Sequence, residues 1–403
     1  MLNKVNTEKI NFCMVIIFLL CYFMLFFDFP NLLTVLIGAV ICLVLLIKQK
    51  KFRLDIGICL LIITISSYFI IRYGIDEAFI MGLPYVGVLM YVLANYLSCE
   101  AKTKENNERL LFIIFFTVVL GYTIHGFLNS YMYLSGYRTE ARRHWYDFWL
   151  NVYLPATEQV IYFLPILSMV FPAIVYFGKN KVLNIFILLS SAFFVYISWI
   201  SDSRMSIFIF PLVFAAQVVL YIILEWDKVK ATIMKKKRLF IAICVCAVAA
   251  LLLFVVIDNP VMSVLKEKLG RDGGVFGSDR FVAQRLALEQ LFVYPMGGSQ
   301  MDFGRISYAH NTWLDMANRA GLIPFLALIA YTFWTIYEMI IWLAKKEIST
   351  KRKLMVAGFY GACFLYYTVE RGIDNSMHFM TPWFFINGMV QGELSIIKEK
   401  SIY

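Results

Sequence analysis

The sequence predicts an all-α fold, a membrane bundle of about twelve transmembrane helices with one large loop outside the cytoplasm. The 403 residues are 61% hydrophobic and 16% charged, whereas an average soluble domain is roughly 45–50% apolar and about 25% charged. Apolar runs of roughly 16–23 residues, about the length that crosses a bilayer, recur along the chain with short polar breaks. Because these runs are continuous and do not alternate, they indicate helices and exclude a membrane β-barrel.

The apolar runs define the expected spans in chain order. The first five occupy 11–27, 31–47, 54–71, 78–97 and 110–130. The other seven occupy 159–177, 183–200, 205–224, 239–257, 322–343, 354–369 and 377–394. No separate soluble domain and no internal repeat is evident, so we expect the whole chain, 1–403, to form a single bundle.

The distribution of Lys and Arg predicts the orientation of the bundle. Cytoplasmic loops of membrane proteins carry an excess of these cations. With the N-terminus inside, most of the 37 Lys and Arg residues fall in short inside segments such as 48–53, 228–238 and 345–353. Both termini are therefore predicted to be cytoplasmic, in a multi-pass protein of the cytoplasmic (inner or plasma) membrane.

Two outer segments, 131–158 and 258–321, are too long to be simple turns, so the function is expected to lie there. The longer one is the large loop between the ninth and tenth spans. Within it, Ser278 is expected to cap a helix that runs to Pro295. Apolar residues outnumber polar ones in this helix, which favours a place on the outer membrane surface or in the mouth of the bundle.

The net charge of +10 follows from this orientation, because the inside cations face anionic lipid of the inner leaflet. We therefore expect membrane lipid as a partner and no nucleic acid. All eight cysteines lie in expected spans or just inside, at Cys99, so the outer loops contain no disulfide pair. The first span is interpreted as retained, because no small-residue cleavage site follows it.

The cations on the two sides differ in kind, since Lys predominates inside and Arg predominates outside. A guanidinium forms bidentate hydrogen bonds with phosphate oxygens and stays charged when partly desolvated, which favours a phosphate site on the outer side. The alternative is a purely structural role, in which single arginines pair with nearby acidic side chains or with lipid headgroups. The outer arginines of interest are Arg143, Arg204, Arg280, Arg285 and Arg371.

Aromatic residues accompany the arginines in the shorter outer segment. Trp145, Tyr146 and Trp149 follow Arg143 closely, and such side chains stack on sugar faces. An interfacial aromatic belt explains the same residues equally well. Sugar binding at Trp145 is therefore one of two interpretations.

In this topology all four histidines lie in the outer half of the bundle or in outer loops. They are His125, His144, His310 and His378. No two of them have the close spacing of metal ligands, and no cysteine is near. The sequence therefore predicts no metal site.

The longer outer segment contains an ordered set of landmarks, namely Arg280, Pro295 fifteen residues later, Gly297-Gly298, His310-Asn311-Thr312-Trp313-Leu314-Asp315 and Gly321-Leu322. This set resembles the O-antigen polymerase and ligase (Wzy-type) superfamily of membrane glycosyltransferases. Ser203-Arg204 is similar to the Ser-Arg element that precedes the major loop in that family. The chain departs from the family where Ser299-Gln300 follows Gly298 in place of a further glycine.

The resemblance implies a polysaccharide polymerase that joins repeat units for an O-antigen, capsule or exopolysaccharide, without a metal or other cofactor. Donor and acceptor would be glycans on undecaprenyl pyrophosphate at the outer face of the membrane. A chain-length regulator and a flippase are candidate partner proteins. By this resemblance Arg204 and Arg280 stabilise the departing pyrophosphate and His310 is the general base.

Other residues are assigned to substrate binding, namely Asn311, Arg143, Trp145, Arg285 and Arg371. Arg285 ranks below Arg280, because five residues place the two about 140° apart around an ideal helix. Glu289, four residues further, could neutralise Arg285 as a helix pair. Arg371 could join the site or pair with Asp374. The alternative for His310 is that it only fixes the loop by hydrogen bonding.

Two other functions remain open at this point. An O-antigen ligase, which transfers the lipid-linked glycan to another acceptor, shares the same landmarks. A lipid-linked sugar transporter or flippase would also have many spans with both termini inside. Transporters usually place charged residues and broken helices near the middle of the bilayer, whereas charges here concentrate at the outer edge, which favours an enzyme.

Overall fold

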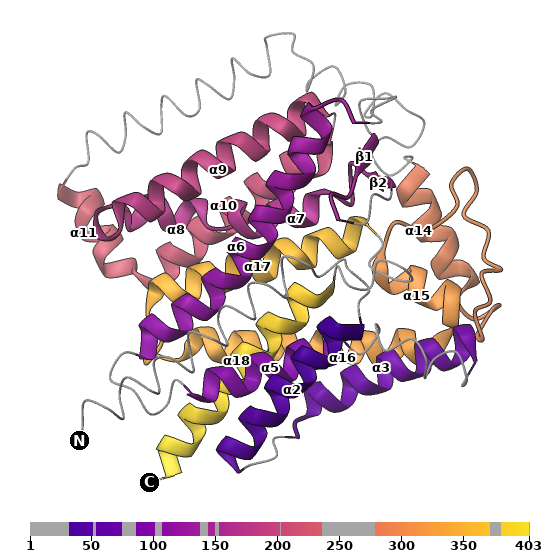
Figure 1. The fold of residues 1–403 in the computed structure, drawn as a ribbon, viewed down its shortest axis with the longest axis horizontal. Coiled ribbons are helices and arrows are strands. Elements are labelled where there is room, and N and C mark those ends of the chain that lie inside the picture. The colour runs from indigo at the N-terminus through magenta and orange to yellow at the C-terminus, as the bar shows by residue number, and fades with distance from the viewer. Residues whose placement is uncertain are drawn as a thin grey trace.

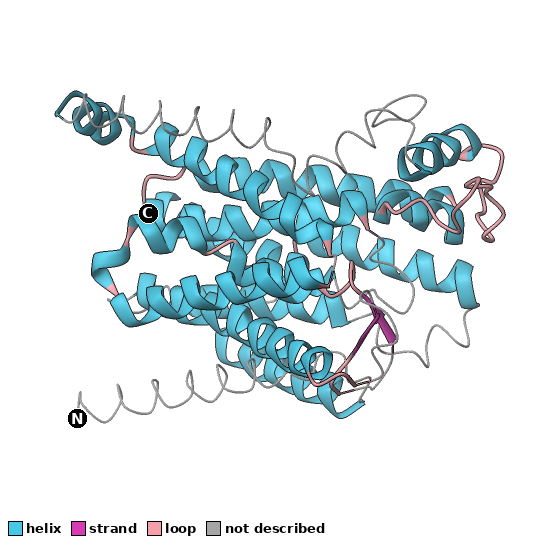
Figure 2. Cartoon of the chain, turned by 90° about the horizontal axis from the view of Figure 1, so that it is seen from above, coloured by secondary structure: helices cyan, strands magenta, loops and turns pink. Residues whose placement is uncertain are grey.

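The computed structural model describes residues 32–50, 54–74, 86–100, 107–137, 144–149, 153–201, 203–235, 279–370 and 380–402. These residues form a layered array of helices with a small β-hairpin at one edge (Figures 1 and 2). The predicted all-α character is therefore confirmed for this part of the chain, and the hairpin is an addition that the sequence did not indicate.

The described residues of the first half of the chain form ten elements. They are α2 (Leu32–Gln49), α3 (Ile56–Tyr73), α5 (Val86–Glu100), α6 (Asn107–Leu134), β1 (His144–Tyr146), β2 (Tyr153–Pro155), α7 (Val160–Leu167), α8 (Val170–Val175), the 3₁₀ helix η3 (Phe177–Lys179) and α9 (Lys181–Ile200). The second half contributes α10 (Arg204–Leu224), α11 (Trp226–Lys235), α14 (Asp279–Gln290), α15 (Thr312–Ala320), α16 (Leu322–Ala344), α17 (Thr350–Val369) and α18 (Thr381–Ile402).

Four of the described helices are long and apolar enough to cross a membrane, namely α3, α6 from Leu110, α9 and α16. A fifth candidate is α10 together with α11, which are bent by 94° at the break between them. Each of the five overlaps an expected span. The runs at 11–27 and 239–257 lie outside the described residues, so the count of twelve spans stays a prediction.

The expected span at 159–177 is broken into α7 and α8, and proline explains the break. Pro172 has no N–H to donate to the carbonyl of Ser168, four residues earlier. The amide of Gln217 on α10 donates to that carbonyl at 2.8 Å, and it also donates to the carbonyl of Leu354 on α17 at 2.8 Å. One buried glutamine thereby joins three helices, and Gly358 leaves room for its side chain.

The β-hairpin lies in the expected outer segment at 131–158. Its two strands are antiparallel, with Trp145 opposite Leu154 and Tyr146 opposite Tyr153. Trp145 and Leu154 are buried, whereas Tyr153 is half exposed. The hairpin follows α6 directly and covers its end (Figure 1).

Small residues allow the closest helix packing in the bundle. Gly388 and Gly392 on α18 face α5, and a Cβ at Gly392 would lie 2.5 Å from the carbonyl oxygen of Asn95. Such small-residue contacts are the usual means by which helices approach each other in lipid.

The helices α14 and α15 form a unit at one end of the bundle, opposite the end that carries α11 (Figure 1). The sequence predicts a helix that runs from the Ser278 cap to Pro295. The structure shows that this helix, α14, ends earlier, at Gln290. A separate apolar cluster joins Ala283 and Ala287 of α14 to Leu314 and Ala317 of α15. Since α15 also packs against α3, α16 and α17, the unit is fixed to the bundle.

We predict that Gln217→Leu lowers the free energy of unfolding by about 1–3 kcal/mol, because two buried carbonyls lose their donor. Denaturant unfolding of the detergent-solubilised protein measures the change. Val219→Leu, at an exposed position on the same helix, is the control and is expected to stay within about 0.5 kcal/mol. Equal stability of the two variants would contradict this role of Gln217.

Candidate functional site

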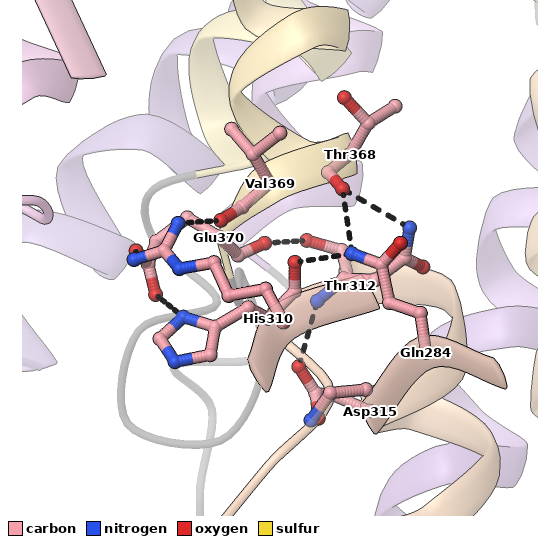
Figure 3. Close-up of polar contacts among 10 residues, drawn as sticks. Gln284, His310, Thr312, Asp315, Thr368, Val369 and Glu370 are labelled. Atoms are coloured by element: carbon pink, nitrogen blue, oxygen red, sulfur yellow. Dashed lines mark hydrogen bonds and ion pairs between the residues drawn. The ribbon is translucent and has the colours of Figure 1, made fainter. Parts of the chain in front are cut away.

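The candidate site lies where the start of α14, the loop before α15 and the end of α17 meet (Figure 3). Glu370, the residue after α17, has a fully buried side chain. Its Oε1 lies 3.1 Å from Nδ1 of His310, and its Oε2 lies 3.5 Å from Nη2 of Arg280. One carboxylate therefore holds two residues that are thirty positions apart in the sequence.

Arg280 is the more open of these two residues, with 39% of its side chain exposed. Its Nη1 donates a hydrogen bond of 2.7 Å to the carbonyl of Val369, the last residue of α17. This places the guanidinium at the negative end of the dipole of α17. A guanidinium has five N–H donors, so Arg280 can bind an anion while it remains paired with Glu370.

His310 is almost enclosed, with 13% of its side chain exposed. When the carboxylate of Glu370 is ionised beside Arg280, it only accepts hydrogen bonds, so Nδ1 of His310 then carries the proton in this pair. The lone pair then lies on Nε2, on the side of the ring away from Glu370 (Figure 3). This tautomer is the one that a general base requires. The ring of Tyr308 covers one face of the imidazole, with centroids 4.0 Å apart.

The backbone of His310 adopts a left-handed conformation, with φ of 51°, which is uncommon for a residue other than glycine. Asp315 holds this turn, because its carboxylate accepts from the backbone N–H of Ala309 at 2.8 Å and of Asn311 at 3.2 Å. Asn311 caps α15 by accepting from the N–H of Leu314. The His-Asn-x-x-x-Asp pattern thus fixes where the imidazole points.

Side chains from the outer segment also bind the end of α17. Thr312 donates to the carbonyl of Glu370 at 3.0 Å, and Asn311 donates to the carbonyl of Thr368 at 3.2 Å. The amide of Gln284, one turn after Arg280, donates to the carbonyls of Thr368 at 3.4 Å and His310 at 3.3 Å. These bonds satisfy carbonyls that a helix end leaves without an intrahelical partner.

The glycine landmarks of the segment have a structural role. Gly297 and Gly321 have positive φ of 73° and 81°, and a Cβ at Gly297 would lie 2.5 Å from the backbone nitrogen of Gly321. The backbone N–H of Leu322 donates to the carbonyl of Pro295 at 2.8 Å. The turn after α14 is therefore attached to the junction of α15 and α16, which fixes α14 relative to His310.

Of the other predicted arginines, two lie in described helices and two lie outside the described residues. Arg285 is 70% exposed and pairs with Glu289 at 3.7 Å, which confirms the expected helix pair. Arg204 is the first residue of α10, directly after Ser203, whose hydroxyl donates to the carbonyl of Ala156 at 2.8 Å. Arg143 and Arg371 lie outside the described residues, so their roles stay predictions.

Trp145 is fully buried in the hairpin and stacks on Tyr133 of α6, with ring centroids 4.4 Å apart. Near it, Nε2 of His125 lies 2.7 Å from Oδ2 of Asp147, and both side chains are buried. In the described ranges, neither these residues nor any others form a group of three His, Cys, Asp or Glu side chains that could hold a metal ion.

Sequence reasoning missed Glu370 and Gln284. Glu370 is an acid placed directly after an apolar span and before Arg371, which is a weak signal because span ends are often charged. Gln284 lies four residues after Arg280, and this spacing puts both side chains on one face of a helix. Neither signal indicates which residues Glu370 and Gln284 contact in the folded chain.

No known protein family matches the chain, and a comparison with curated proteins finds no significant match either.

Burial raises the pKa of Asp315 to about 6, although the hydrogen bonds that it accepts from the backbone N–H groups of Ala309 and Asn311 act in the opposite direction. A carboxyl group with a raised pKa in the folded state favours folding when it is protonated. Its contribution is full below pH 3.8, the ordinary value of the group, and is lost as the pH rises through about 6.

We predict that Asp315→Asn is less stable than the wild type at pH 5, because an amide provides one acceptor oxygen where the carboxyl provides two. The difference in melting temperature should narrow as the pH rises to 7.5, since only the wild type then carries a buried charge. Thermal unfolding of both proteins in detergent from pH 5 to 7.5 measures this. A difference that does not change with pH would contradict the raised pKa.

Proposed function

We propose that the chain is a membrane-embedded polysaccharide polymerase that joins undecaprenyl-pyrophosphate-linked repeat units on the outer face of the cytoplasmic membrane. The observation that supports it most is the shared carboxylate of Glu370, which brings Arg280 and His310 into one site. Two separate landmarks of the superfamily pattern, Arg280 and the run that begins at His310, thereby lie in contact with one carboxylate.

The proposed reaction needs a base and an anion-binding group. Nε2 of His310 accepts the proton of the acceptor sugar hydroxyl, and the hydroxyl oxygen forms a bond with the anomeric carbon of the donor glycan. The bond between that carbon and the pyrophosphate oxygen breaks, and undecaprenyl pyrophosphate leaves with the electron pair. The guanidinium of Arg280 stabilises this developing charge. Arg204, Arg143 and Arg371 are candidates for further phosphate contacts.

The proposed topology has about twelve spans with both termini in the cytoplasm. It is supported by the charge pattern and by the arrangement of α16 and α17. The start of α16 and the end of α17 meet α15 at the site, while the basic segment 345–353, which joins their other ends, is expected inside. The exposed apolar residues of α14 and the following turn, Phe281, Leu288 and Phe292, suit contact with the outer leaflet.

We predict that Arg280→Gln and His310→Gln each lower the rate of glycan extension, by about 10²–10³-fold and about 10²–10⁴-fold respectively. The assay supplies purified protein with lipid-pyrophosphate-linked repeat units, and gel electrophoresis measures the ladder of longer glycans. Arg305→Gln, an exposed arginine of the same outer segment, is the matched control and is expected to extend glycans normally.

Near-normal extension by either variant would remove that residue from the proposed chemistry. Transfer by the wild type only after an unrelated acceptor is added would favour the ligase. Cells that lack the protein distinguish the two enzymes as well, because loss of a polymerase leaves single lipid-linked repeat units, whereas loss of a ligase leaves lipid-linked polymer of full length.

A further inference from the structure

A cavity with polar and apolar walls lies at the end of the bundle away from the candidate site. It is a cleft of about 710 Å³ between the end of α16, the start of α17 and the C-terminal part of α18. Arg352 of α17 lines it. Since a helix rises 1.5 Å per residue, Arg352 lies about 27 Å along α17 from Glu370. The cleft is therefore separate from the candidate site and takes no part in the proposed transfer.

Arg352 is the buried cation of this cleft, with 14% of its side chain exposed. Its Nη2 lies 3.2 Å from Oε2 of Glu393, which also accepts from the indole of Trp342 at 2.9 Å. The Nε and Nη1 atoms of Arg352 are buried and have no hydrogen-bond partner among the described residues. Buried donors of a guanidinium require acceptors, and phosphate oxygens match their fork geometry.

The cleft continues from this charged end along a mainly apolar wall. Trp334 and Ile341 of α16 and Leu394 and Ile397 of α18 line it, and the carboxyl of Glu338 lies between the first two. From Lys345 at the charged end to Trp334 the wall extends about 16 Å along α16, and α16 is one of the candidate membrane spans. A free phosphate ion would use only the charged end, whereas an acyl chain would cover the apolar wall.

The lining carries charges of both signs. Lys345 and Lys398 lie in the cleft with Arg352, and so do the carboxylates Glu338 and Glu347. The basic residues fall in segments that the proposed topology places at the cytoplasmic surface. A ligand with a phosphate at one end and a hydrocarbon tail would meet the basic side chains at the surface and the apolar wall within the bilayer.

We propose that this cleft binds a glycerophospholipid of the inner leaflet, with its phosphate diester on Arg352 and one acyl chain along Trp334 and Ile341. The inference rests on the orientation given with the proposed function. It needs no glycosyl transfer, so it can be tested in protein that has no measurable polymerase activity.

Native mass spectrometry of the purified full-length chain measures bound phospholipid directly. We expect Arg352→Gln to reduce lipid occupancy at least about tenfold, the effect of losing a charge-assisted contact. Ile341→Trp should also reduce it, because the larger ring fills the apolar wall while Arg352 is unchanged. Lys346→Gln, next to Lys345 but exposed and outside the cleft, is the matched control and should retain lipid.

Equal occupancy in Arg352→Gln and Lys346→Gln would overturn the proposal. If Arg352→Gln does not fold, Ile341→Trp decides, because unchanged lipid in that variant means that no chain lies along the wall. A second arm adds inorganic phosphate to delipidated protein. Stabilisation by phosphate equal to that by phosphatidylglycerol would assign the cleft to a free anion and reject the lipid.

Discussion

A buried carboxylate at the end of α17 determines how the outer segment is arranged. Moving a charge out of water costs several kcal/mol unless partners compensate for it. The side chain of Glu370 is fully buried, and two of its partners, Arg280 and His310, come from two different parts of the outer segment. The ion pairs therefore require the start of α14 and the loop before α15 to meet at this helix end.

Backbone hydrogen bonds add to the same constraint. The last carbonyls of any helix lack intrahelical partners. Here Asn311 donates to the carbonyl of Thr368, Arg280 to that of Val369 and Thr312 to that of Glu370. Residues proposed for chemistry thus also close the end of a helix. This dual use explains how a loop segment can hold a base and a cation in fixed positions, as electrostatic stabilisation of a leaving group requires.

The sequence predicts the helices well where an apolar run is long, because α3, α6, α9 and α16 overlap the expected spans closely. The break between α7 and α8 could have been predicted from Pro172. The hairpin could not, since three-residue strands give too short an alternation. Gln217 reads as an isolated polar residue within an apolar run, and only the fold shows that it joins three helices.

Only part of the candidate site could be predicted from the sequence, and the reason is physical. Arg280, His310 and Asn311 were singled out because the order of landmarks in their segment resembles that of the Wzy-type superfamily. Glu370 belongs to a different element, and its pairing depends on how α17 packs against that segment, which no local pattern records. Arg285 shows the value of helix geometry, because its spacing to Glu289 predicts the ion pair that the structure contains.

A double-mutant cycle on glycan extension tests most directly whether Glu370 acts through His310. The rates of Glu370→Gln, His310→Gln and the double variant are compared, with equal melting temperatures as the check on folding. If Glu370 orients the imidazole, its substitution lowers the rate at least about tenfold more beside His310 than once His310 is absent, when only the pairing with Arg280 is lost. An equal loss in both backgrounds would contradict a shared site.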